Sequence, residues 1–566
     1  MLFRSLLMVL AWLVPFHFLP WVSWQNEVLA FGAVLALALA GMARQTTRLE
    51  VRFPFVAFFF SLLAIVAVLQ TLAGQITFAG DAFVVACYCV LCIACLSIGF
   101  DSCSRVDSVA PDSAVRTHRA RSEHRLSVLA MALVFGAFIS ALVSFAQVFD
   151  LWEPSEFIAR MPSIRRPGGN LGQPNQLATL LLMGMASLLF LYESRYIAAS
   201  VGGMIGLVLI VGVAVTESRT AVLSFAALAA WFLIKRNTVR FKFRAWVLAS
   251  WALAFVILFW TWPILLGSLL QLDSSATVDL RAGARWIVWP QLVAALMMKP
   301  WTGWGIGRVS DALNAVADRY VSSEPFTYSH NILLDLALGI GIPLATLVLV
   351  LGLNWLFRRA RQANQLTTWY CLALTLPLAI HSMLEFPFAY AYFLVPVMFA
   401  IGVLEGTVAA RQFISINWLA TATALIAICC AMAWSVVEYI AIEEDFRVAR
   451  FEALRTGKTP ADYERPHVFL LTQLRGLLEG ARIVPAPGMT RDRIDLARQV
   501  ALRFPWPATQ NRYALSLALN GNPDEALRQL KVLHAMHGEL MYASIKANWE
   551  ALARDKYPQL AEFAVP

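Results

Sequence analysis

One histidine is a candidate for acid–base chemistry. His330 lies in Ser329-His330-Asn331, directly before a long apolar run, and this polar triplet is typical of a helix N-terminus. The unpaired N–H groups and the partial positive charge at such an end disfavour a protonated imidazole. We therefore expect His330 to stay neutral and able to accept a proton, as a general base must. The structural alternative is a histidine that only caps the helix at a membrane surface.

Arg219 is a candidate ligand for an anion. It lies in Thr216-Glu217-Ser218-Arg219-Thr220, before an apolar run of about 14 residues that ends at Lys235 and would form about 21 Å of helix. Such a helix is shorter than the hydrocarbon core. We therefore expect Arg219 to lie below the membrane surface, where a charge usually marks a ligand or ion path. A Glu217–Arg219 pair that holds the turn is the structural alternative.

Arg281 and Arg285 form a second possible anion site. They are four residues apart and would project from one side of an interfacial helix. A guanidinium group can bind two phosphate oxygens at once, so both arginines are candidates for phosphate contact. The alternative is that they only extend toward the lipid headgroups. The apolar face predicted for this helix comprises Trp286, Trp289, Leu292 and Leu296.

Amide and tyrosine side chains could bind the uncharged part of a ligand. The loop 163–176 is rich in glycine and proline and ends in Asn175 and Gln176, which offer both donors and acceptors. An ordinary turn capped by Asn175 explains these residues equally well. Tyrosines at a membrane interface more often belong to its aromatic belt than to a site. Weaker candidates follow an apolar run that ends near residue 384, namely Glu385, Tyr390 and Tyr392.

The elements that must position these residues are mostly membrane helices. Hydrophobic residues make up 59% of the 566 residues and charged residues 14%, which excludes a soluble globule for most of the chain. Apolar runs that can cross about 30 Å of hydrocarbon recur through most of the sequence. We predict an all-α polytopic membrane protein with thirteen spans, at roughly 5–21, 27–43, 53–73, 82–100, 126–148, 177–192, 197–215, 220–234, 245–263, 329–357, 366–384, 390–408 and 415–440.

Basic residues predict the orientation of these spans. Every even-numbered span is followed by arginine or lysine, which places the N-terminus in the cytoplasm. The net charge of +9 is then mostly a topology signal, and we expect no nucleic-acid partner. All candidate residues fall on the outer side, opposite the basic loops. The orientation is inferred from the basic loops alone, so this agreement among the candidates is independent of it. A basic, amide-rich outer site with one neutral histidine favours an anionic ligand carried by the membrane lipid, and we expect no metal site.

The composition changes near residue 441. We predict a transmembrane domain at 1–440, with a large outer loop at about 264–328, and a soluble helical domain outside the membrane at 441–566. In the second domain, 511–530 predicts a helix, a tight turn and a helix, and it resembles a tetratricopeptide (TPR) half-repeat. We see no catalytic constellation there, so we expect this domain to bind a partner or to brace the membrane domain.

Four patches occur together: Ser218-Arg219-Thr220-Ala221, Arg285-xxx-Trp289 leading to Pro300-xx-Gly303-x-Gly305-x-Gly307, His330-Asn331-xx-Leu334, and Gly341. In combination they resemble the membrane ligases that move a sugar chain from a lipid diphosphate, a superfamily of O-antigen ligases, O-antigen polymerases and O-linked protein oligosaccharyltransferases. Many relatives have a glutamate where this chain has Gly339, so no acid is assigned there. The loop 172–176 and the tail resemble the pilin-type protein-glycosylating branch. The resemblance covers roughly residues 160–566.

The resemblance implies transfer of a whole oligosaccharide from undecaprenyl diphosphate to Ser or Thr hydroxyls of pilin-like or other periplasmic proteins. The enzyme would lie in the bacterial inner membrane with its site facing the periplasm. His330 would be the general base, and Arg219 and Arg285 would neutralise the diphosphate. One displacement predicts inversion, without a metal or other cofactor. The substrate-binding roles then fall to Arg281, Asn175, Gln176, Asn331, Glu385, Tyr390 and Tyr392.

Other functions stay open from the sequence. The acceptor could be the lipid A core, as for an O-antigen ligase, or another repeat unit, as for a polymerase. The soluble tail and the amide-rich loop favour a protein acceptor. A transporter of lipid-linked sugars is the alternative from a different class, but the sequence shows neither the internal repeat nor the two-sided polar path expected of one.

Overall fold

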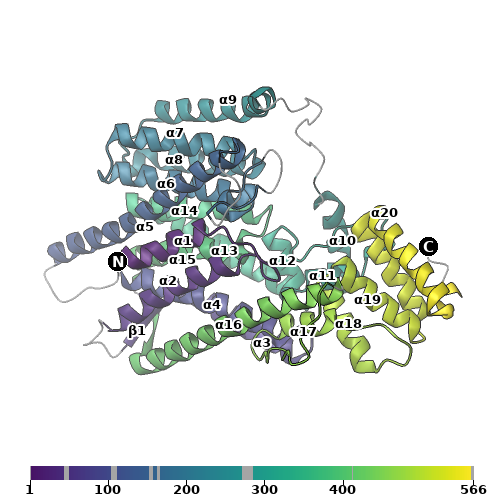
Figure 1. Cartoon of the computed structure of the whole chain (residues 1–566). Coiled ribbons are helices and arrows are strands. Elements are labelled where there is room, and N and C mark those ends of the chain that lie inside the picture. Colours follow the sequence, from purple (N-terminus) through teal and green to yellow (C-terminus); the bar gives the residue numbers. More distant parts are fainter. Residues whose placement is uncertain are drawn as a thin grey trace. The chain divides into compact units, whose positions relative to one another are not determined.

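The fold is known from a computed structural model that describes residues 2–43, 50–103, 111–151, 157–161, 166–269, 283, 285–410, 412–454 and 456–562, without the side chains of 2–5, 111–121, 269 and 562. Its architecture is all-α, as predicted, apart from two short strands (Figure 1). The helices that correspond to predicted spans are α1 (Leu2–Leu13), α2 (Trp24–Ala43), α3 (Ala57–Leu72), α4 (Ala79–Asp101), α5 (Pro111–Val148), α6 (Pro174–Glu193), α7 (Ala199–Val215), α8 (Arg219–Val239), α9 (Ala245–Leu269), α13 (Ile342–Gln362), α14 (Leu366–Ser382), α15 (Ala391–Val408) and α16 (Trp418–Ala453). The other elements are β1 (Glu50–Pro54), α10 (Arg285–Met298), α11 (Val309–Asn314), α12 (Ile332–Ile340), β2 (Phe413–Asn417), α17 (Thr472–Ala481), α18 (Arg491–Arg503), α19 (Pro507–Leu519), α20 (Pro523–Asp555) and four 3₁₀ turns, η1 (Gly169–Leu171), η2 (Ala317–Arg319), η3 (Pro387–Ala389) and η4 (Pro558–Glu562).

The chain is a multi-pass membrane protein. Over the described residues, 9 helices are long and apolar enough to cross a bilayer: α2, α4, α5, α6, α8, α9, α13, α15 and α16. Helices α3 and α7 are apolar but shorter. The number of thirteen spans stays a prediction.

Several of the predicted spans are wrong in their limits. The run 5–21 is helical only to Leu13, α5 begins before and α16 ends after the predicted span, and two further differences bear on the candidate site. The run 329–357 is not one helix, because Gly341 has a φ of +83° and separates α12 from α13. Helix α12 has only 9 residues, about 14 Å of helix, which is too short to cross a bilayer. Helix α8 has 21 residues and continues through Lys235 and Arg236, both good helix formers. Its length therefore gives no reason to place Arg219 below the membrane surface.

The chain divides into two compact units, which are described separately. Unit 1 comprises Met1–Leu63, Cys87–Leu280 and Gly352–Ala431, and unit 2 comprises Ala64–Ala86, Arg281–Leu351 and Met432–Pro566. The boundary predicted at residue 440 falls inside α16, and the segment 281–351 groups with the tail. A functional division into 1–440 and 441–566 stays a prediction.

Unit 1 is a bundle of apolar helices built around α6. Helices α5, α7, α8 and α14 all pack against α6, and Figure 1 shows α6, α7 and α8 side by side. Fifteen of the 20 residues of α6 are buried. Helices α5 and α6 approach closely at Gly184, where a Cβ atom would lie 2.5 Å from that of Ala137. This packing holds α6 rigidly, so its N-terminal residues are suited to position other groups.

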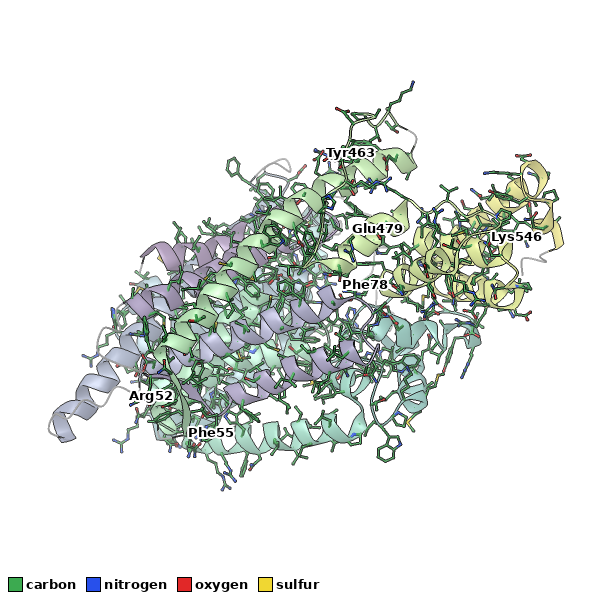
Figure 2. All side chains as sticks on the ribbon, turned by 90° about the horizontal axis from the view of Figure 1, so that it is seen from below. Arg52, Phe55, Phe78, Tyr463, Glu479 and Lys546 are labelled. Atoms are coloured by element: carbon green, nitrogen blue, oxygen red, sulfur yellow. The ribbon has the colours of Figure 1, made fainter. Side chains whose placement is uncertain are left out.

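The loops that follow even-numbered spans contact one another within unit 1. Strand β1, which contains Arg52 (Figure 2), pairs antiparallel with β2 and so joins the loops after spans two and twelve. Lys242 Nζ, after span eight, donates to Glu193 O, at the end of span six, at 2.7 Å. Arg359 and Glu405 form a buried ion pair at 2.6 Å between the ends of α13 and α15. These contacts agree with the predicted division of the loops into two sets.

Unit 2 packs the tail against the segment that carries α10 to α12. One core joins α10, α11 and α12 to Val532 and Met536 of α20. A second core joins α18, α19 and α20, which Figure 1 shows as neighbouring helices. The predicted helix–turn–helix is confirmed, with its turn at Gly521 (φ +79°), whereas the TPR-like assignment stays a prediction. Of the predicted apolar face of α10, Leu292 is buried and Trp286 is 70% exposed, and its contact with the membrane interface stays a prediction.

Candidate active site

In unit 1, three of the predicted segments meet at Asn175. Asn175 is the second residue of α6, Ser218 caps α8, and Glu385 follows α14. The Oδ1 atom of Asn175 accepts a hydrogen bond from Ser218 Oγ at 2.7 Å, and its Nδ2 atom donates to Glu385 Oε1 at 3.3 Å. The amide uses its donor and its acceptor at once, which fixes its orientation. Arg219 follows Ser218 directly and is exposed beside this cluster.

Arg166 joins the cluster, although the sequence analysis did not single it out. Its Nε atom donates to Thr216 O at 3.0 Å, and its Nη2 atom donates to Asn175 Oδ1 at 3.4 Å. Burial lowers the pKa of Arg166, Glu217 raises it, and the positive charge of Arg219 lowers it further. Two guanidinium groups that interact electrostatically favour a ligand with more than one negative charge. The only available signal was its place in the loop that precedes α6.

Gln176 and Tyr392 are buried and bonded to each other. Their exposed fractions are 7% and 2%, and Tyr392 Oη donates to Gln176 Oε1 at 2.8 Å. Tyr390 is only partly buried, and its ring stacks on that of Tyr392 with centroids 5.2 Å apart. Of these three residues, Tyr390 offers the most side-chain surface to a ligand. Their substrate-binding roles stay predictions.

In unit 2, His330 lies in a strained polar turn that precedes α12. Its φ is +60°, in the left-handed region that residues with a Cβ atom seldom adopt. The polar cap predicted at 329–331 is present, and Asn331 forms it: its Oδ1 atom accepts hydrogen bonds from the N–H groups of Leu333 and Leu334 at 3.0 and 3.1 Å. The imidazole lies against the ring of Phe326, with centroids 4.4 Å apart. Backbone strain of this kind is often found at functional sites.

Asp335 holds the same turn from within α12. Its Oδ1 atom accepts a hydrogen bond from the Ser329 N–H at 3.0 Å, while its buried Oδ2 atom has no hydrogen-bond partner among the described residues. Burial raises the pKa of Asp335 to about 6, although hydrogen bonds from Ser329 and the interaction with His330 lower it. The sequence analysis missed Asp335, because a single acid inside an apolar run matches no motif. Its distance of five residues from His330 was the only signal.

Arg285 is connected to the His330 turn through its own helix. It is the first residue of α10 and is partly buried. One turn later, Trp289 Nε1 donates to Ser329 O at 2.7 Å. The structure therefore ties the start of α10 to the turn that carries His330. Arg281 lies outside the described residues, so its predicted place beside Arg285 stays a prediction.

The glycine-rich exit from α10 packs against the end of α12. The Ile342 N–H donates to Pro300 O at 2.7 Å, and Gly303 and Gly341 have φ angles of +70° and +83°. A Cβ atom at Gly341 would lie 2.1 Å from Trp301 O. These glycines are required by close backbone approach, which explains why the motif at 300–307 occurs together with Gly341.

The end of α3 and the start of α4 also make contacts in unit 2 that the sequence did not indicate. Gln70 Nε2 donates to Gly339 O at 2.7 Å, and Gln70 Oε1 accepts from the Ile306 N–H at 3.0 Å. Nearby in the chain, Asp81 accepts hydrogen bonds from Arg503 Nε at 3.0 Å and Nη2 at 2.9 Å. Residues 70–81 thus connect the end of α18 in the tail to the segment that carries His330.

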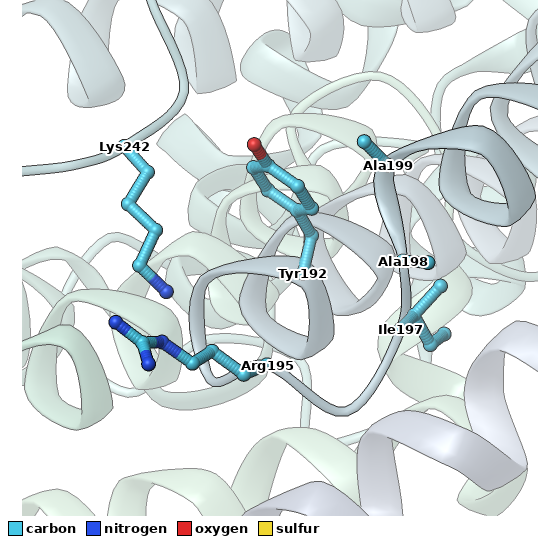
Figure 3. Close-up of a pocket in the computed structure, with 6 residues that line it drawn as sticks. All are labelled: Tyr192, Arg195, Ile197, Ala198, Ala199 and Lys242. Carbon is cyan, nitrogen blue, oxygen red and sulfur yellow. The ribbon is translucent and has the colours of Figure 1, made fainter.

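A surface hollow of about 410 Å³ lies elsewhere in unit 1 (Figure 3). It follows the C-terminal end of α6, whereas Asn175 is at the N-terminal end of the same helix. With 20 residues, α6 separates the two by about 30 Å. The hollow is therefore distinct from the cluster at Asn175. Its lining residues are Tyr192, Arg195, Ile197, Ala198, Ala199 and Lys242.

Comparison with known proteins shows that these segments are similar to enzymes that transfer or polymerise glycans. The family described as O-antigen ligase matches residues 203–349, protein glycosylation ligase matches 167–192, and the C-terminal part of the virulence factor membrane-bound polymerase matches 369–551. A general O-oligosaccharyltransferase of Acinetobacter baylyi is 23% identical over 553 residues, which are 95% of this chain and 92% of that protein. A ComP-specific O-oligosaccharyltransferase of the same organism is 27% identical over 384 residues, 66% of this chain and 65% of that protein.

The fold and these matches define a membrane-embedded glycosyltransferase. More narrowly, the chain is similar to the O-antigen ligases and, among their relatives, to the protein O-oligosaccharyltransferases. The resemblance noted in the sequence is thereby confirmed. The O-antigen ligase match contains Arg219, Arg285 and His330, and the protein glycosylation ligase match contains Asn175 and Gln176.

Proposed function

We propose that the chain transfers a whole oligosaccharide from undecaprenyl diphosphate to Ser or Thr hydroxyls of pilin-like or other periplasmic proteins. The enzyme would work in the bacterial inner membrane with its site open to the periplasm. The matches to protein-glycosylating enzymes support a protein acceptor, and one of these relatives is named for its specificity for ComP. The observation that carries the chemistry is the turn of unit 2, in which a helix cap, an indole N–H and a buried carboxylate fix the backbone at His330.

The proposed reaction is one displacement at the anomeric carbon. His330 removes the proton from the acceptor hydroxyl while that oxygen forms its bond to the anomeric carbon. The bond from this carbon to the diphosphate oxygen breaks, and its electron pair leaves with the diphosphate. The configuration of the sugar is therefore inverted.

Arg219 and Arg285 are the proposed ligands of the diphosphate. A guanidinium fork matches two phosphate oxygens and keeps its charge at every physiological pH. Charge neutralisation in the transition state makes diphosphate a good leaving group, and this role requires no metal ion. The exposure of Arg219 and its interaction with Arg166 support a site for an anion with several charges.

The remaining residues are proposed to position the substrates. Asn175 and Glu385 form one hydrogen-bonded group, and the ring of Tyr390 could pack on a sugar face. Gln176 and Tyr392 would support this group from the buried side. Asn331 fixes the helix that follows His330, and Arg281 is proposed as a further contact to the donor.

A reconstituted transfer assay tests this function. The full-length enzyme receives a polyprenyl-diphosphate oligosaccharide and either a pilin-like protein or a lipid A core, with and without a chelator. We expect glycosylated protein with and without the chelator, and an inverted linkage by NMR. The O-antigen ligase match at 203–349 makes the lipid A core the second candidate acceptor. Glycan on the lipid alone would make the enzyme an O-antigen ligase, and loss of transfer with the chelator would contradict the metal-free mechanism.

A further inference from the structure

We propose that Asp335 is a positioning residue for His330, which fixes the turn around the imidazole and offsets the charge that the imidazole gains during transfer. This inference rests on the proposed role of His330 as the base. It goes further, because no sequence motif indicates Asp335 and its role follows from the contacts of one turn in unit 2.

The first part of the argument is geometric. Asp335 lies in the first turn of α12, and its Oδ1 atom accepts the Ser329 N–H at 3.0 Å. Ser329 Oγ donates to Asn331 O at 2.8 Å, so the residues on both sides of His330 are held. His330 itself has a φ of +60°, a strained conformation that persists only where neighbouring contacts impose it. The carboxylate of Asp335 is one of those contacts.

The second part concerns charge. The Oδ2 atom of Asp335 is buried and has no hydrogen-bond partner among the described residues. A carboxylate in that state has capacity left to stabilise a nearby positive charge, and the attraction is strong where water is excluded. When His330 takes the acceptor proton it becomes an imidazolium. Asp335 would favour this form without receiving the proton, as the third member does in other oriented acid–base systems.

The two described helices that pack against α12 carry few charged groups. Helix α12 packs against α10 and α11. The charged residues of α10 and its end are Arg285 and Lys299, and α11 with its cap contributes Arg308 and Asp311. Arg308 and Asp311 are paired with each other. The acidic residues of α10, α11 and α12 are Asp311 and Asp335, and of these two only Asp311 forms an ion pair with an arginine among the described residues.

The test compares Asp335→Asn with the wild-type enzyme in the reconstituted assay. Asparagine keeps an oxygen for the Ser329 N–H but removes the charge. We expect kcat to fall by about tenfold, with an unchanged KM for the donor, because the charge matters only once the proton moves. The acid limb of the pH–rate profile should move down by about 1 pH unit, because the negative charge no longer favours the imidazolium. Asp318→Asn, which removes a carboxylate elsewhere in unit 2, should match the wild type in both measurements.

Thermal unfolding separates this role from a purely structural one. Because the pKa of Asp335 is raised to about 6, its ionised form is held at a cost to folding above that pH. The folded state is thus favoured by protonation, and Asp335→Asn should unfold at an equal or higher temperature at pH 8. Lower activity together with equal or higher stability is the expected combination.

A second variant keeps the charge. Asp335→Glu should recover part of kcat and return the acid limb toward its wild-type position. Equal losses in the Asn and Glu variants would show a steric role and overturn the proposal. Wild-type kcat and pH profile in Asp335→Asn, with His330→Ala inactive, would overturn it as well and leave the proposed function intact. Full activity of His330→Ala would overturn both.

Discussion

The cluster at Asn175 in unit 1 and the turn at His330 in unit 2 use similar polar residues but satisfy them differently. Asn175 uses both atoms of its amide, in hydrogen bonds to Ser218 and Glu385. In the turn of unit 2, His330 has a left-handed backbone and Asp335 has a buried oxygen without a hydrogen bond among the described residues. The amide of Asn175 is fully hydrogen-bonded, whereas the carboxylate of Asp335 is only partly so. Backbone strain and a buried carboxylate oxygen also occur in unit 1, at Glu217 next to Ser218, although not at Asn175 itself.

This difference suggests a division of labour. Strained backbone and unsatisfied buried groups persist where function requires them, whereas satisfied networks mainly fix geometry. We infer that the proton-transfer step depends on unit 2, and that the cluster at Asn175 recognises and orients the donor. Arg219 is the exception in unit 1, because it is exposed next to Glu217, whose φ is +50°.

The largest effect is expected when the backbone of unit 2 is disturbed. Gly341→Ala would place a Cβ atom 2.1 Å from Trp301 O and force a left-handed φ on alanine. We expect a loss of about 3 kcal/mol in the free energy of unfolding and no detectable transfer. The matched control is Gly352→Ala in α13, where a Cβ atom meets nothing within 4 Å. That variant should be as active as the wild type and more stable by up to about 1 kcal/mol.

These two glycines can be compared by thermal unfolding in detergent and by the transfer assay. Near-normal activity of Gly341→Ala would show that the contact between the end of α12 and the exit of α10 does not govern the site.

An intermediate effect is expected at the cluster in unit 1. Asn175→Asp would replace the donor that faces Glu385 with an oxygen and place two acids side by side. We expect the donor KM to rise by about tenfold, with a smaller change in kcat, because orientation is affected more than chemistry. Ser218→Ala removes one donor to Asn175 Oδ1 and the N-cap of α8. It should change KM less, and the lost cap should lower stability by about 1 kcal/mol. Loss of kcat at constant KM would contradict the division between the two units.

The smallest effect is expected at the buried tyrosine. Tyr392→Phe removes the hydroxyl that donates to Gln176 Oε1 and leaves that oxygen unpaired. Stability should fall by about 1–2 kcal/mol, whereas kcat and KM should change by less than about twofold. A tenfold loss of activity without loss of stability would instead show that Tyr392 contacts the substrates.

The sequence predicted the elements better than their limits. Helix type and most membrane helices follow from apolar runs, and the Asn331 cap follows from the triplet before α12. The break at Gly341 was missed, because an apolar run continues on both sides of it and only the contact with Trp301 reveals the bend. The length of α8 was also missed, because lysine and arginine end an apolar run without ending a helix.

The sequence predicted those candidate site residues that lie in recognisable polar motifs, and it did not predict the others. Segments around Asn175, Ser218 and Glu385 are far apart in the chain, and the topology predicted from basic residues placed them on the same side of the membrane; the hydrogen bonds of Asn175 join them. Arg166 and Asp335 were not predicted. Arg166 contacts a residue that is distant in the chain, and the contacts of Asp335 depend on its burial, so neither follows from a sequence motif. The burial of Gln176 against Tyr392 could not be predicted from the sequence either, because amides and tyrosines are found both in protein cores and in binding sites.

The most direct test of the account is the transfer of glycan by His330→Ala. The variant and the wild type are inserted in the same vesicles with a polyprenyl-diphosphate oligosaccharide and a pilin-like protein, and product is followed under single-turnover conditions. The account predicts normal insertion and donor binding with transfer reduced by at least about a thousandfold. Transfer at near the wild-type rate would contradict the assignment of His330 as the base and of unit 2 as the place of the chemical step.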